Sequence, residues 1–254
     1  MTSRGSRAVL ILSALVLVAS ARRADAQSEP QALSAASMAI ACAPSLSLTP
    51  APVDSLRVLG SQDSALRLLF GPRDLVVVNG GTQAGVQLGQ QYFVRRPFSF
   101  GPPSNSPAHI VHTTGWLRIV AVNDTTAIAQ LDTTCDAVRA GDYLEPFTAP
   151  VEPAEAASAE AGAPLDFSSL SRVMYGDEER RMGGTGDFML LEYGAAGVAP
   201  GTRVALYRDL RTPGLPLTVV GEGVIVSVTN GTPVMRITTA RDAVLSGDYV
   251  VPHK

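Results

Sequence analysis

The chain has 254 residues, of which 46% are hydrophobic and 17% charged, and its formal net charge is −3. This composition is typical of a globular protein, and the length suits one large domain or two small ones. The mildly negative net charge argues against extensive electrostatic binding to nucleic acid or anionic lipid, so no nucleic-acid partner is expected.

The first 26 residues have the pattern of a secretory signal peptide. Arg4 and Arg7 precede a short apolar run, residues 8–19, and small-residue cleavage sites end at Ala21 and Ala26. The run is shorter than the roughly 20 residues that cross a bilayer, so no membrane span is expected after cleavage. Cleavage after Ala26 is preferred because it leaves no arginine beside the cut. It removes four arginines and one aspartate, which leaves 16 basic and 22 acidic residues and a net charge of −6.

Residues 27–54 are rich in Ala, Ser and Pro, and we expect a flexible segment tethered at Cys42. The second cysteine is Cys135, and an even cysteine count in an exported chain favours a disulfide. This bond would close a loop of about 90 residues and contribute about 4–5 kcal/mol in the chain-entropy model. Lipidation of Cys42, in a weak lipobox-like AIAC, and two free thiols are the alternatives.

An internal repeat dominates the rest of the chain. Residues 115–146 align with residues 221–252 at a constant offset of 106, without a gap, and 13 of 32 positions are identical. The match extends upstream, where 74–96 resembles 187–208. We therefore predict two modules, module 1 at 55–147 and module 2 at 169–254. An Ala/Pro/Glu-rich linker at 148–168 joins them.

Each module reads as β-structure. Short apolar runs end in turn residues, and alternating segments flank Asn123-Asp124 in module 1 and Asn230-Gly231 in module 2, which predicts a hairpin in each. At this size we predict an all-β protein made of two tandem small β-barrels of SH3-like type, because closing a barrel removes exposed sheet edges.

Both modules end with Gly-Asp-Tyr, at Gly141-Asp142 and again at Gly247-Asp248. A glycine can adopt positive φ, and an aspartate side chain can bond the turning backbone. We interpret these residues as structural turns that start each module's last strand.

Module 1 carries an insertion at 96–116 that module 2 replaces with a shorter segment. It is rich in aromatic and histidine residues, and long loops of this kind often bind partners. The candidate ligand or partner residues are Tyr92, Phe98, Phe100, His109, His112 and Trp116. The alternative is a proline-rich flap in which Phe98 and Phe100 cover the module's own core.

The sequence offers no metal, cofactor or catalytic site. His109 and His112 are three apart, which places them on opposite faces of a strand, and further ligands are lacking. We expect His112 to be a surface residue. The chain contains no G-x-S-x-G, H-E-x-x-H, phosphate-binding glycine loop or C-x-x-C. We therefore predict that it is not an enzyme and needs no cofactor.

The order GVQLGQQYFVRR, GWLRIVAV, AIAQL and AGDYL in module 1 returns in module 2 as GVAPGTRVALYR and SGDYV. It resembles the C-terminal domain of the flagellar assembly T protein and the β-module that follows lysin motifs in bacterial envelope proteins. The resemblance implies a non-catalytic part of a cell-envelope assembly that associates with an envelope protein or with peptidoglycan. The chain has no recognisable lysin motif and lacks the other domains of the flagellar protein.

We therefore expect a periplasmic or secreted binding or scaffolding adaptor. Its partner would be an envelope protein. The alternative is a peptidoglycan- or glycan-binding module that uses the aromatic 96–116 loop.

Overall fold

The computed structural model describes residues 33–47, 52–63, 67–98, 109–152, 164–176, 180–192 and 198–253, with Phe98 described by its backbone alone. The predicted signal peptide at 1–26 and most of the predicted linker lie outside these residues. From Leu33 onward the chain forms one compact unit.

The described part begins with a short helix, α1 (Ala35–Cys42), and a short strand, β1 (Ser45–Ser47). Ser34 caps the helix, because its side-chain oxygen accepts a hydrogen bond from the Ser37 N–H at 3.0 Å. The segment predicted to be flexible therefore contains regular structure between residues 35 and 47.

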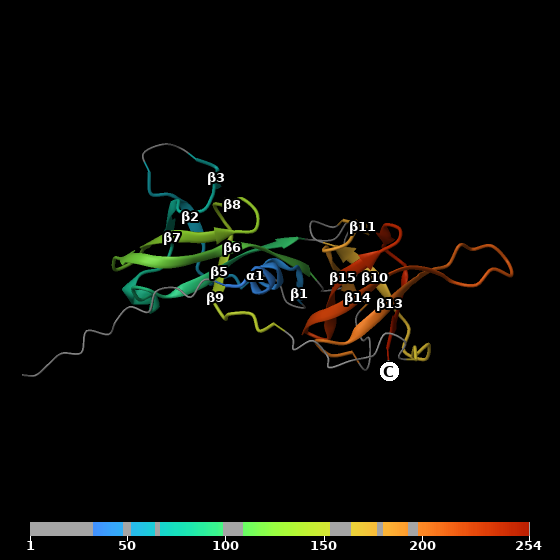
Figure 1. Cartoon of the computed structure of the whole chain (residues 1–254). Helices are drawn as coiled ribbons and strands as arrows, with labels where there is room; N and C mark the ends of the chain where they lie inside the picture. The colour runs from blue at the N-terminus through green and yellow to red at the C-terminus, as the bar shows by residue number, and fades with distance from the viewer. Residues whose placement is uncertain are drawn as a thin grey trace, which may run out of the picture. The chain divides into compact units, whose positions relative to one another are not determined.

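Module 1 is a curled half-barrel. Its sheet runs in the order β2-β4-β7-β6-β5-β9, and β1 adds to it by pairing with β6 (Figure 1). The edges approach each other through one isolated bridge between Arg57 and Tyr143. The elements are β2 (Val58–Ser61), β3 (Leu69–Phe70), β4 (Leu75–Val78), η1 (Thr82–Ala84), β5 (Gln91–Phe98), β6 (His109–Val122), β7 (Ala127–Thr134), β8 (Val138–Arg139) and β9 (Tyr143–Pro146).

Module 2 is a closed barrel of six strands in the order β10-β12-β15-β14-β13-β17. The barrel closes where Ser171 and Arg172 of β10 pair with Val250 and Tyr249 of β17. The strands are β10 (Ser171–Gly176), β11 (Met182–Gly183), β12 (Phe188–Leu191), β13 (Arg203–Arg208), β14 (Thr218–Thr229), β15 (Thr232–Ala240), β16 (Val244–Leu245) and β17 (Tyr249–Pro252). The predicted all-β class with barrel-like modules is confirmed.

The two modules repeat each other down to their irregularities. The β6–β7 ladder shifts register between Ile119 and Ala121, and the β14–β15 ladder shifts between Ile225 and Ser227. The extra residue is a valine in both, Val120 and Val226, at the offset of 106. Because a bulge bends its strand, a shared bulge gives both sheets a similar curvature at this point.

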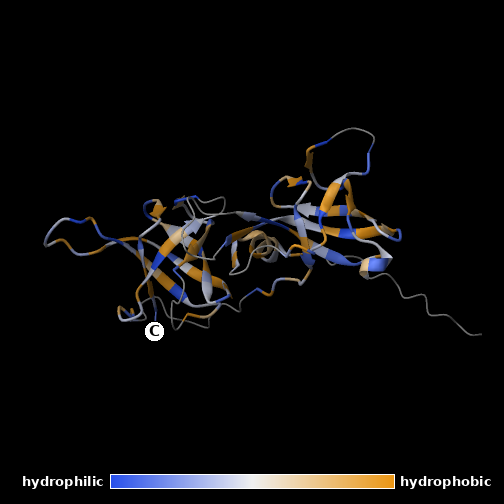
Figure 2. Ribbon diagram, turned by 180° about the vertical axis from the view of Figure 1, so that it is seen from behind, coloured by the Kyte–Doolittle hydropathy of each residue, from blue (hydrophilic) through white to orange (hydrophobic). Residues whose placement is uncertain are grey.

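Each module has its own apolar core, built from alternate strand residues (Figure 2). In module 1 it includes Val76, Leu117, Ile119 and Leu131, and in module 2 Met189, Leu206, Ile225 and Ile237. Alternation places the remaining strand residues on the outside of each sheet.

Gly115 and its counterpart Gly221 lie where neighbouring strands approach too closely for a side chain. A Cβ at Gly115 would lie 2.3 Å from the Thr133 carbonyl oxygen, and one at Gly221 would lie 2.4 Å from that of Thr239. Both modules have glycine at this position because the neighbouring strand leaves no room for a Cβ atom.

Candidate binding surface

The predicted aromatic residues do not form one platform. Trp116 is only 6% exposed and clusters with Phe93 and Ala41. Tyr92, the neighbour of Phe93 on β5, packs against the barrel core instead. Trp116 and Tyr92 therefore lie on opposite faces of the sheet. Phe100 and the side chain of Phe98 are outside the described residues, so neither the recognition loop nor the flap can be placed.

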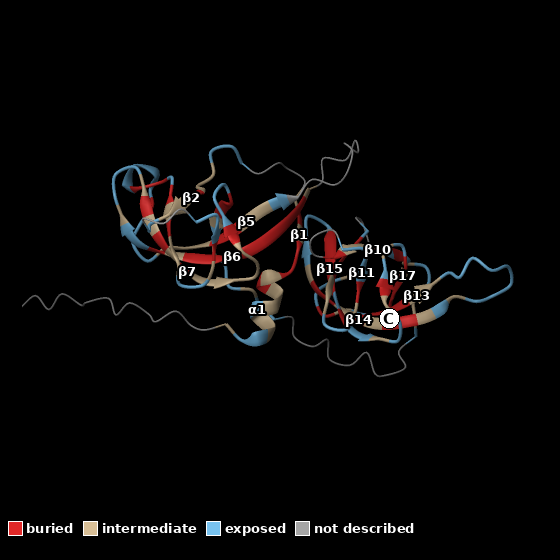
Figure 3. Ribbon diagram, turned by 90° about the horizontal axis from the view of Figure 1, so that it is seen from above, coloured by how far each residue is buried: buried red, intermediate tan, exposed pale blue. Residues whose placement is uncertain are grey.

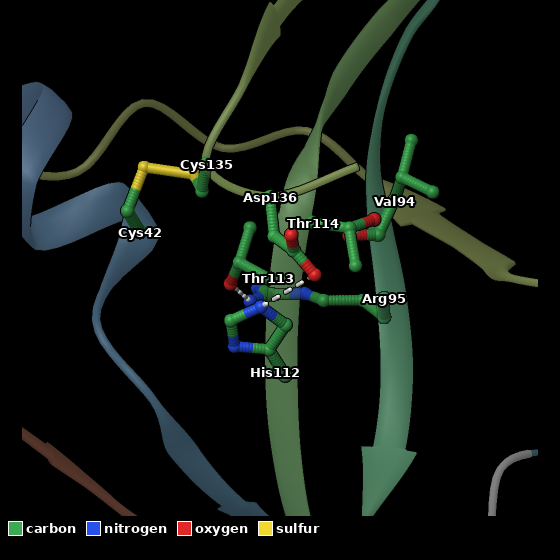
Figure 4. Close-up of a disulfide and its surroundings, with 8 residues drawn as sticks. All are labelled: Cys42, Val94, Arg95, His112, Thr113, Thr114, Cys135 and Asp136. Atoms are coloured by element: carbon green, nitrogen blue, oxygen red, sulfur yellow. Dashed lines mark hydrogen bonds and ion pairs between the residues drawn. A yellow bond between two sulfur atoms is a disulfide. The ribbon is translucent and has the colours of Figure 1, made fainter. Parts of the chain in front are cut away.

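Helix α1 covers Trp116. Its last residue, Cys42, forms a disulfide with Cys135 with a Cα–Cα distance of 5.6 Å, which confirms the predicted pairing (Figure 4). The ring of Phe147 lies 5.9 Å from that of Trp116, and the guanidinium of Arg95 lies 4.4 Å from the ring centroid of Phe93. The aromatic cluster is thus enclosed by the protein's own groups.

His112 is 2% exposed, so the expectation of a surface histidine is wrong. Its Nε2 lies 3.8 Å from a carboxylate oxygen of Asp136, which follows the disulfide cysteine (Figure 4). The preceding residues of β6 pair with β1, a strand that the sequence did not predict and that helps to enclose this edge. His109 is half-buried. The described residues contain no cluster of three or more His, Cys, Asp or Glu side chains that could hold a metal ion.

The Gly-Asp-Tyr turns are the centres of two matching polar networks. Gly141 and Gly247 both have φ of 94°. Asp142 accepts two hydrogen bonds from Arg96, at 2.8 and 2.7 Å, and one from the Arg139 N–H at 2.9 Å. Such a bidentate pair is the strong form of a charge-assisted hydrogen bond.

Module 2 repeats this network with Arg208 and Asp248. The two Arg208 hydrogen bonds measure 2.9 and 2.8 Å, and the Leu245 N–H donates to the same carboxylate at 2.7 Å. Each arginine also contacts a second aspartate, Asp136 in module 1 and Asp242 in module 2.

These carboxylates hold both guanidinium groups in the charged form. Burial lowers the pKa of Arg96, but the hydrogen bonds and charges of Asp142 and Asp136 outweigh it and raise the pKa. The hydrogen bond to Asp248 is the main cause that raises the pKa of Arg208. Each network joins the end of one strand to the start of another. Asp142 and Asp248 are both hydrogen-bonded within it, which indicates a structural role.

The sequence contained a signal for this pairing. Arg96, Asp136 and Asp142 all have counterparts in module 2, at Arg208, Asp242 and Asp248. Charged residues of opposite sign that recur together in a repeat indicate a conserved pair within the fold.

An open depression of about 480 Å³ lies on module 2, between residues 182–187 and 240–243. Its two carboxylates are already engaged. Asp242 binds Arg208, and Asp187 accepts a hydrogen bond from the Gly184 N–H at 2.8 Å. Both carboxylates of this depression therefore have hydrogen-bond partners within module 2.

Among the described residues of module 1, the outside of its sheet carries a set of apolar side chains that are exposed or partly exposed. Leu59 of β2 is 53% exposed and Val120 of β6 is 40% exposed. Between them the sheet carries partly exposed apolar side chains from β4 and β7. We define the outer face of module 1 as Leu59, Leu75, Val77, Val120 and Ile128.

The corresponding outer face of module 2 is covered. We define it as Met174, Phe188, Leu190, Val226 and Val234. Three of these residues, Leu190, Val226 and Val234, are at most 5% exposed and belong to one cluster with Ala43, Leu46 and Ile110.

No protein-family model matches the chain, and no curated protein matches it. The resemblance to envelope modules therefore remains a prediction, and the structure supports the coarser statement of two β-rich modules. Within the part of the chain that the structure describes, no helix is long and apolar enough to cross a membrane. The disulfide fits an oxidising compartment and hence an exported protein.

Proposed function

We propose that the protein is a non-catalytic adaptor of the bacterial cell envelope, in the periplasm or secreted, and that it binds another protein through the outer face of module 1. The observation that carries this proposal is an apolar sheet surface with two side chains that are 40% and 53% exposed, Val120 and Leu59. An exposed apolar patch on a folded domain commonly marks a protein interface.

The chemistry of this face suits a protein more than a glycan. Its residues are aliphatic, whereas sugars are usually bound with aromatic rings and hydrogen-bonding groups. The glycan alternative depends on the 96–116 loop, and its tryptophan is only 6% exposed beneath α1. The chemistry of the outer face of module 1 therefore favours a protein-binding adaptor over a glycan-binding module.

The test is cross-linking in living cells with the tagged mature protein, followed by identification of the captured protein. Val77→Glu places a charge in the middle of the face, and we expect at least a tenfold loss of capture because an unpaired carboxylate would be buried. Met182→Glu is the matched control, since Met182 is 59% exposed on module 2, away from this face. Unchanged capture with Val77→Glu, or recovery of sacculus fragments alone, would contradict the proposal.

A further inference from the structure

The outer faces of modules 1 and 2 carry apolar residues at corresponding positions but differ in exposure. Val226 of module 2 is 5% exposed, whereas its counterpart Val120 of module 1 is 40% exposed. Both valines are the extra residue of the same bulge, so the backbone beneath them is similar. The difference in exposure therefore comes from what lies over the face and not from the sheet that builds it.

The outer face of module 2 is covered by the N-terminal part of the described chain. We define the α1–β1 segment as residues 35–47. Its strand β1 contacts β14 and β15, beside which it lies in Figure 3. The Asn230 side-chain amide donates a hydrogen bond to the Leu46 carbonyl at 2.9 Å. Three apolar side chains of the segment and one from β6 cluster with the face: Ile40, Ala43, Leu46 and Ile110.

The α1–β1 segment has one covalent anchor, and it lies beside the covering residues. Cys42, the last residue of α1, is bonded to Cys135, which directly follows β7. Ala43 is the next residue after the anchor, and Leu46 is the fourth. The disulfide therefore keeps the covering side chains close to the outer face of module 2.

The other contacts of the α1–β1 segment are few. The helix has eight residues and β1 has three, and an isolated helix of this length does not persist in water. The Ser37 hydroxyl donates to Glu152 at 2.8 Å, but this hydrogen bond is exposed and stabilises little. Short segments with few buried contacts open locally at low cost in free energy. The disulfide is therefore the main restraint on the opening of this cover.

The disulfide is within reach of a reductant, because both of its cysteines are partly exposed. A thiolate of a dithiol attacks one sulfur, which breaks the Cys42–Cys135 bond and forms a mixed disulfide. The second thiol of the dithiol then displaces the protein sulfur. Cys42 and Cys135 have together gained two electrons and two protons and end as thiols, while the dithiol ends as a disulfide.

We propose that the α1–β1 segment is a redox-controlled cover, which a dithiol releases from the outer face of module 2 by reducing Cys42–Cys135. In the oxidised protein the segment occupies this face and excludes any other chain from it. In the reduced protein the segment detaches, and the face becomes as exposed as that of module 1. The inference goes beyond the proposed function, because it does not depend on what binds module 1.

The test is hydroxyl-radical footprinting of side chains in the purified mature protein, read by peptide mass spectrometry. Oxidised protein is compared with protein that has been reduced with dithiothreitol and desalted without oxygen. The modification rate of Val226 should rise about eightfold, because its exposed fraction should go from 5% to the 40% of Val120. The core residues Leu206 and Ile225 should keep their low rates, and reoxidation should restore the original rate at Val226.

A variant tests the cover with the disulfide intact. Leu46→Asp places a carboxylate in the apolar cluster, which disfavours docking of β1, so Val226 should be modified faster even in the oxidised protein. Met38→Asp is the matched control, because Met38 lies on α1, is 37% exposed and is outside the cluster. This control should keep the wild-type rate at Val226.

An unchanged rate at Val226 after reduction would overturn the inference. So would a Leu46→Asp variant that protects Val226 as well as wild type does. A simultaneous rise at Leu206 would also overturn it, because the barrel would then be unfolding instead of losing its cover. None of these outcomes bears on capture of a protein by the outer face of module 1, which is tested separately in cells.

Discussion

Asp248 is only 5% exposed, and its carboxylate accepts hydrogen bonds from Arg208 and from the Leu245 N–H. Asp142 has the equivalent partners in module 1, Arg96 and the Arg139 N–H, together with a weaker contact from the Thr114 hydroxyl at 3.4 Å. A buried carboxylate is tolerated only when such partners replace its water. At the residue scale, the repeated tripeptide is therefore explained by a strand-closing ion pair.

The first prediction concerns this pair. Asp248→Asn keeps the shape but removes the charge that faces Arg208, and we expect a loss of about 2–4 kcal/mol in the free energy of unfolding. Asp242→Asn is the control, because its side chain is 67% exposed and it contacts the same arginine. The control should cost less than about 1 kcal/mol. Urea unfolding measures both, and equal losses would contradict the assignment.

A second residue-scale prediction concerns alkaline pH. Burial, followed by the charge and hydrogen bond of Glu145, raises the pKa of Tyr143. The folded state thus favours the neutral phenol. The contribution of Tyr143 to the free energy of unfolding is complete below the ordinary tyrosine pKa of 10.0, and it declines as the pH rises above that value.

Replacing Tyr143 with Phe removes this titration. The free energy of unfolding of Tyr143→Phe should therefore fall less steeply than that of wild type above about pH 10. Denaturant midpoints measured at intervals from neutral to alkaline pH give both profiles. Parallel profiles above that pH would show that Tyr143 does not contribute.

At the element scale, the stability of α1 depends on its packing against module 1 and on the disulfide at Cys42. The helix has eight residues, fewer than the roughly 12–15 that an isolated helix needs, so packing and the disulfide must hold it. It covers the only tryptophan in the chain, Trp116. Release of α1 is therefore visible in tryptophan fluorescence.

Reducing Cys42–Cys135 should lower stability by about 4 kcal/mol, because the bond closes a long loop in the unfolded chain. It should also shift the emission of Trp116 to longer wavelength as water reaches the ring. The double variant Cys42→Ala with Cys135→Ala should behave like the reduced protein. An unchanged melting temperature together with an unchanged spectrum after reduction would contradict this role of the disulfide.

Local patterns in the sequence predicted the hairpins and the repeat, because turn residues and alternation act over a few positions. The same reasoning missed α1 and β1, whose stability comes from contacts with Trp116 and with Ile110 more than 60 residues away. It found Asp142 but not its partner Arg96, because the two meet only when β5 and β9 pair. The burial of His112 and Trp116 was missed for the same reason.

At the scale of the whole molecule, the duplication gives each module a similar apolar outer face, and only one of the two faces is covered. The outer face of module 2 is covered by Ala43 and Leu46 of the N-terminal segment and by Ile110 of β6, whereas the outer face of module 1 has no equivalent cover within the described residues. The sequence predicted the two modules but not this asymmetry, because it depends on contacts between them.

The most direct measurement is site-specific photo-cross-linking in living cells from position 59, where Leu59 is 53% exposed on the outer face of module 1. A photoreactive amino acid replaces Leu59, and a control variant carries it in place of Met182, which is 59% exposed on module 2. The account predicts that position 59 captures a defined envelope protein and that position 182 does not. Equal capture from both positions, or no captured protein from position 59, would contradict it.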